Sequence, residues 1–137
     1  MNKEKFKLMG TSRMVSQLCA ALGAITLIVY CIYGFVYDYF DIVVFLSMLL
    51  GIGFAQIYVM IEKSEFANLI SVACFSFGLG LFFLNSYPVW ADRLNNITMY
   101  GSRGTLFPVI SIIILTILCI LMEIISCFVN KRGEADK

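Results

Sequence analysis

The sequence predicts an all-α integral membrane protein with four transmembrane helices. Three observations predict this class: 61% of the 137 residues are hydrophobic, only 14% are charged, and the apolar residues gather in four long runs. Each run matches the roughly 20 residues that a helix needs to cross a bilayer. Because the runs are continuous and do not alternate, they favour helices over barrel strands. We therefore expect one membrane domain, residues 1–137, built as an antiparallel four-helix bundle.

The expected helices cover residues 14–36, 42–61, 66–87 and 107–129. The first follows a basic segment but is longer than the apolar core of a signal peptide, so we expect it to remain a membrane helix. Short connections, 37–41 and 62–65, predict hairpins between consecutive helices. The short charged ends, 1–12 and 130–137, predict mobile tails beside the membrane. Only the loop at 88–104 is long.

The distribution of Lys and Arg predicts the orientation. With a cytoplasmic N-terminus, eight basic residues fall inside and two fall outside, and such a bias fixes topology by the positive-inside rule. The inner set is Lys3, Lys5, Lys7, Arg13, Lys63, Lys131, Arg132 and Lys137, and the outer set is Arg93 and Arg103. Both termini are thus expected to be cytoplasmic. Most Tyr residues and the single Trp fall at the outer interface, where such rings anchor.

Rows of small residues predict where the helices pack together, because small side chains let backbones approach in lipid. The rows are Ser47, Gly51 and Ala55 in the second helix, Ala20, Gly23 and Ala24 in the first, and Ala67, Ser71, Ser76 and Gly80 in the third.

Glu123 is the only formal charge within the four apolar runs. A carboxylate is costly in hydrocarbon, so it is expected to face the bundle or water, and it is a candidate ion, proton or partner site. Only six residues separate it from the end of its run, so a purely structural role is the alternative. Gln17, Gln56 and Asn68 fall in the same leaflet and are candidate hydrogen-bond partners.

The long outer loop holds the second candidate site. A helical segment at 90–100 would place Trp90 and Leu94 on one face, which suits a short helix lying in the membrane interface. Beyond it, free amides at the start of the fourth helix could hold an anion or a lipid headgroup. The residues of this candidate site are Arg93, Gly101, Arg103 and Gly104, although an ordinary capped turn is the alternative.

The composition argues against catalysis. The chain has no His, and its five Cys residues form no Cys-x-x-Cys pair, so we expect no metal site, no cofactor and no enzymatic activity. We also expect the lipid bilayer, and no nucleic acid, among the partners of the chain.

The function expected is that of an accessory or partner-binding subunit in the plasma membrane, with a membrane protein or a second copy of the chain as partner. The alternative is an oligomeric transporter or channel for ions or small solutes that uses Glu123.

Overall fold

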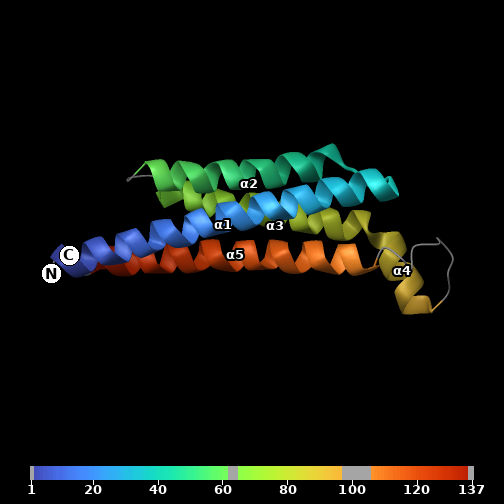
Figure 1. Cartoon of the computed structure of the whole chain (residues 1–137). Coiled ribbons are helices and arrows are strands. Elements are labelled where there is room, and N and C mark those ends of the chain that lie inside the picture. The colour runs from blue at the N-terminus through green and yellow to red at the C-terminus, as the bar shows by residue number, and fades with distance from the viewer. Residues whose placement is uncertain (1, 62–64, 97–105, 136–137) are drawn as a thin grey trace.

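A computed structural model describes residues 2–61, 65–96 and 106–135 of the chain. The described residues form five helices and no strand (Figure 1). The helices are α1 (Asn2–Tyr37), α2 (Ile42–Met60), α3 (Glu65–Asn85), α4 (Tyr87–Asn95) and α5 (Leu106–Ala135). The all-helical class expected from the sequence is confirmed for this part of the chain.

Four of the helices are long and apolar enough to cross a membrane. Their candidate spans are Gly10–Tyr37, Ile42–Met60, Phe66–Asn85 and Leu106–Val129. These spans lie close to the four runs expected from the sequence, which supports a multi-pass membrane protein. Large apolar side chains cover the outside of all four helices, as expected where the surrounding solvent is lipid.

The ends of the helices differ from the sequence expectation. α1 begins at Asn2 and α5 continues to Ala135, so helix replaces most of the two expected tails. Charged residues in the first and last turns do not stop a helix, and only Gly10 weakens this part of α1. Both termini lie at the same end of the molecule, called here the terminal end (Figure 1).

The α1–α2 connection is a tight, capped turn. Asp38 adopts a left-handed backbone with φ 61°, and the N–H of Tyr39 donates back to the carbonyl of Gly34. A Cβ atom on Gly34 would lie 2.9 Å from Phe40, so only glycine fits under this turn. Asp41 then caps α2 by accepting from the N–H of Val43 at 2.9 Å.

The four long helices pack through a repeating pattern of buried positions. α1 lies antiparallel to α5 and also contacts α2, and α3 contacts α2 and α5 (Figure 1). The buried positions of α5 follow a spacing of three and four residues: Val109, Ile112, Thr116, Cys119, Glu123 and Ser126. The same spacing recurs in α1 and is that of left-handed coiled coils. Because this spacing alternates between three and four residues, Ser126 is buried whereas its neighbour Cys127 is half-buried.

The expected rows of small residues are only partly buried. Ser47, Gly51 and Ala55 all face the interior, and Gly51 lies under the ring of Phe75. Ala20 and Gly23 are also buried. Ala24, Ser76 and Gly80 instead point outward, because the buried face of α3 passes through Ser71, Phe75 and Gly78. The expectation that these three residues pack inside is therefore wrong.

Candidate functional site

Glu123 is fully buried between the helices, six residues before Val129, the terminal end of its candidate span. Its Oε1 accepts a hydrogen bond from the hydroxyl of Ser16 on α1 at 3.0 Å. Its Oε2 is buried and has no hydrogen-bond partner. The Ser16 hydroxyl also lies 3.4 Å from the carbonyl oxygen of Ala55 on α2. The carboxyl therefore faces the interior and does not reach the surface.

A polar layer lies beside Glu123 toward the terminal end. It contains Ser12 of α1, Tyr58 of α2, Asn68 of α3 and Ser126 of α5, so every long helix contributes one side chain. Together with Ser16 and Glu123, these residues are called the polar cluster here.

The hydrogen bonds of this layer assign a direction to most of its protons. The hydroxyls of Ser12 and Ser126 each donate to the backbone carbonyl of the other residue at 2.9 Å. Tyr58 must then donate to the Oγ of Ser12, which lies 2.6 Å away. Asn68 donates through Nδ2 to the Oγ of Ser126 at 3.1 Å, while its Oδ1 is buried without a partner. The polar cluster thus holds two unpartnered acceptor oxygens.

The residues expected beside Glu123 are placed differently by the structure. Asn68 is buried and joins the polar cluster through Ser126, not through Glu123. Gln17 is exposed on the outer face of α1, and Gln56 is partly exposed on α2. The hydrogen bond to Glu123 comes from Ser16 instead. The available signal was that Ser12 and Ser16, four residues apart, lie on one face of α1, as Glu123 and Ser126, three residues apart, lie on one face of α5.

Within the part of the chain that the structure describes, no basic side chain compensates the carboxyl. Among the described residues, no Lys or Arg donates to either oxygen of Glu123. An ionised Glu123 would therefore have only neutral neighbours, the hydroxyl of Ser16 and the thiol of Cys19, to replace its hydration, which is a costly arrangement in a low-dielectric interior.

An apolar core separates the polar cluster from the opposite end, where α4 lies. Cys19 and Cys119 come next, with Cys19 donating to the carbonyl of Cys119 at 3.2 Å. Phe75 packs against both cysteines, and Met48 and Ile112 continue the core. The described cysteines are all free thiols, and no three His, Cys, Asp or Glu side chains among the described residues gather to hold a metal.

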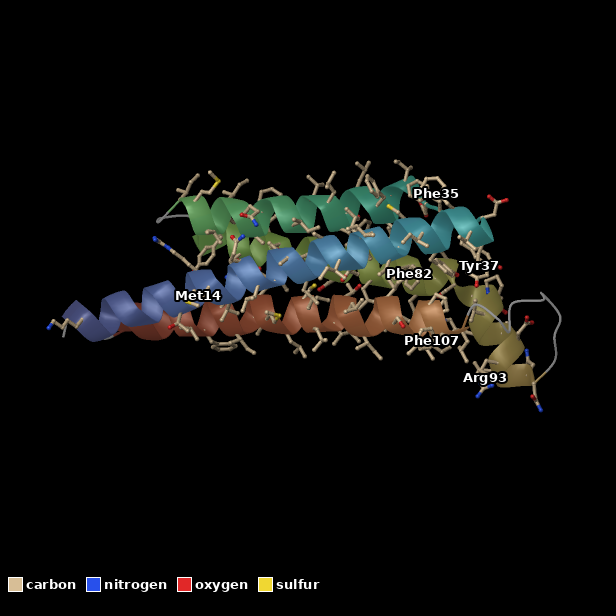
Figure 2. The ribbon with its side chains drawn as sticks, in the orientation of Figure 1. Met14, Phe35, Tyr37, Phe82, Arg93 and Phe107 are labelled. Atoms are coloured by element: carbon tan, nitrogen blue, oxygen red, sulfur yellow. The ribbon has the colours of Figure 1, made fainter. Side chains whose placement is uncertain are left out.

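The second expected site lies mostly outside the described residues. Gly101, Arg103 and Gly104 belong to residues 97–105, which the structure does not describe. Arg93 is exposed in the last turn of α4 (Figure 2), while Val89 and Asp92 of the same helix are buried. The helix runs from Tyr87 to Asn95, with Asn96 as its C-cap, so it begins and ends earlier than the 90–100 segment expected from the sequence. The anion site therefore stays a prediction.

An open apolar groove lies between α3 and α5. It has a volume of about 870 Å³ and faces the side that lipid would cover. Its lining includes Ser76, Phe77, Gly80, Leu84, Ile113 and Ile117. An added Cβ at Gly80 would meet no atom within 4 Å, so the backbone of α3 is open at this point.

Comparison with models of known protein families, with curated proteins and with solved structures finds no match to this chain.

Proposed function

We propose that the protein is a non-enzymatic integral membrane protein of the plasma membrane that binds one transmembrane helix of another membrane protein. The groove between α3 and α5 carries this proposal. It lies within the apolar spans, so its occupant must itself be apolar. A helix fits this length and chemistry because its backbone groups are already paired.

The small residues of the groove support a helix as the occupant. Ser76 and Gly80 are exposed and four positions apart on α3, which lets a neighbouring backbone approach closely. Phe77, a residue that is 57% exposed, also lines the groove next to them. Contact would rest on van der Waals packing, since the polar cluster is hidden on the other side of α3 and α5.

The proposed topology is four antiparallel spans with both termini in the cytoplasm. The eight-to-two bias of basic residues supports it. In this topology α4 lies at the outer membrane surface as a short interfacial helix. Leu94 is 83% exposed, and Trp90 stacks on Phe83 with ring centroids 5.3 Å apart, so both rings and the leucine are available to lipid near the headgroups.

A second candidate function is an oligomeric transporter or channel that uses Glu123. The full burial of this carboxyl among the four helices favours it. The packed core around Phe75 and Met48 favours the partner-binding function, because it leaves no polar route between the two ends of the described structure.

Site-specific photo-crosslinking in native membranes tests the proposal. A photoreactive amino acid at Phe77 should give one protein adduct of defined mass, and the same amino acid at Leu50, exposed on α2, should not. Gly80→Leu should remove the adduct, because a leucine fills the groove, while Gly53→Leu should keep it. Gly53 is a matched control, since it also has no atom within 4 Å of an added Cβ.

The adduct's mass separates a partner protein from a second copy of this chain. Adducts with lipid alone at Phe77, or equal protein adducts at both positions, would contradict the proposal.

A further inference from the structure

We propose that the polar cluster binds a small monovalent cation of the Na⁺ type between Glu123 and Asn68. Two acceptor oxygens carry this proposal: Oε2 of Glu123 and Oδ1 of Asn68 are both buried and both lack a donor. Buried polar atoms in folded proteins are nearly always paired, so two orphans in one cluster indicate a missing electropositive group. This inference goes beyond partner binding, because the polar cluster is separate from the groove.

The other atoms of the polar cluster are the ligands that such a cation prefers. The hydroxyls of Ser16 and Ser126 bond the two side chains that carry the orphan oxygens, and the hydroxyls of Ser12 and Tyr58 extend this group through Ser126. The thiol of Cys19, on the far side of Glu123, is the one soft group beside it among the described residues. Ser16 uses its proton toward Glu123, so the lone pairs of its Oγ remain available. Carboxylate, amide and hydroxyl oxygens are hard ligands and select hard cations over metals that favour nitrogen or sulfur.

The charge balance selects a monovalent ion. Glu123 is the only buried acidic residue in the terminal half of the described bundle, and it has no Lys or Arg partner there. One positive charge would neutralise it, whereas a divalent ion would leave a net charge in the hydrocarbon region, which is costly. The tight packing of the cluster, in which Glu123, Ser16 and Asn68 are all buried, favours a small ion over a large one.

The location of the polar cluster allows a cation to enter from the terminal end only. Tyr58 lies in the last turn of α2 and Asn68 in the first turn of α3, so the polar layer stands between the terminal end and Glu123. Cys19, Cys119 and Phe75 close the other side. The site is therefore suited to hold an ion that fastens α1, α3 and α5 together, and not to conduct it across the bilayer.

Cation-dependent thermal unfolding of the purified protein in detergent tests the proposal. Replacing choline by Na⁺ at constant ionic strength should raise Tm in a saturable manner. Glu123→Gln, which keeps the shape of the side chain, should abolish this rise, and Asn68→Ala should shift the half-saturating Na⁺ concentration upward by at least tenfold. Gln17→Ala is the control, because Gln17 lies on the same turn of α1 as Ser16 but is exposed.

Binding of radioactive ²²Na⁺ provides a second readout that does not depend on the stability of a variant. The parent protein should bind one ion per chain, and Asn68→Ala should bind it more weakly. The proposal is overturned if the parent has the same Tm in Na⁺ and choline, if it binds no ²²Na⁺, or if only acidification stabilises it. The last outcome would assign a proton to the carboxyl instead.

Discussion

At the scale of single residues, Tyr30 and Tyr33, two buried tyrosines on neighbouring turns of α1, differ in the hydrogen bonding of their hydroxyls. The hydroxyl of Tyr30 accepts from the N–H of Asp41 at 2.9 Å and donates to its carbonyl at 3.2 Å. It thereby joins α1 to the start of α2. The hydroxyl of Tyr33 is also buried but has no hydrogen-bond partner. Both rings pack edge-on against Phe82, so their apolar contacts are similar.

Replacing each tyrosine by phenylalanine distinguishes the hydrogen-bonded hydroxyl of Tyr30 from the unpaired hydroxyl of Tyr33. Tyr30→Phe should lower the free energy of unfolding by about 1 to 3 kcal/mol, because the backbone groups of Asp41 lose their partner. Tyr33→Phe should be neutral or stabilising, since it removes an unpaired hydroxyl. Denaturant or thermal unfolding in detergent measures both. An equal loss in the two variants would mean that Tyr33 has a partner in solution.

The placement of Glu123 shows which features of a single residue could be predicted from the sequence and which could not. Its inward orientation could be predicted, because an exposed carboxyl in lipid is costly. Its partner could not, because Ser16 is adjacent in sequence to Gln17 and only the register of α1 against α5 decides which of them faces Glu123. Serine is also a common packing residue in membrane helices, so the sequence alone does not mark it.

At the scale of helices, the length and apolarity of the four spans were predictable, whereas their ends and faces were not. α1 and α5 continue past the apolar runs because nothing in residues 2–12 or 130–135 breaks a helix and the serines at 12 and 126 bond across the pair. The outward face of Ser76 and Gly80 was not predictable, since small residues line interfaces within the chain and with partners alike.

Two glycines of α2 test the packing between α2 and α3. A Cβ atom added to Gly51 would lie 3.0 Å from the ring of Phe75. The carbonyl of Gly51 accepts a hydrogen bond from the hydroxyl of Ser71 at 2.7 Å. Gly51→Leu should destabilise the protein by about 1 to 3 kcal/mol, the usual cost of overpacking. Gly53→Leu should not, because its side chain would point outward. Equal thermal stability of the two variants in detergent would show that the contact with Phe75 does not form.

At the scale of the whole molecule, the two ends carry different chemistry. The terminal end gathers the polar cluster and, in sequence, most of the basic residues. The opposite end gathers aromatic rings, including Phe35, Tyr37 and Phe82, together with α4 (Figure 2). The antiparallel arrangement places both termini on one side (Figure 1). Which side this is depends on the basic residues alone, because the fold itself has no preferred direction in a bilayer.

Cysteine labelling on intact cells tests the proposed orientation. In a cysteine-free background, Asn95→Cys should react with an impermeant thiol reagent, because the end of α4 faces the outside in the proposed topology. Ser64→Cys, in the short connection between α2 and α3, should react only after the membrane is made permeable. Its position beside Lys63 places it with the inner set of basic residues. Labelling of Ser64→Cys but not Asn95→Cys on intact cells would reverse the orientation, since both ends of each span would then have exchanged sides.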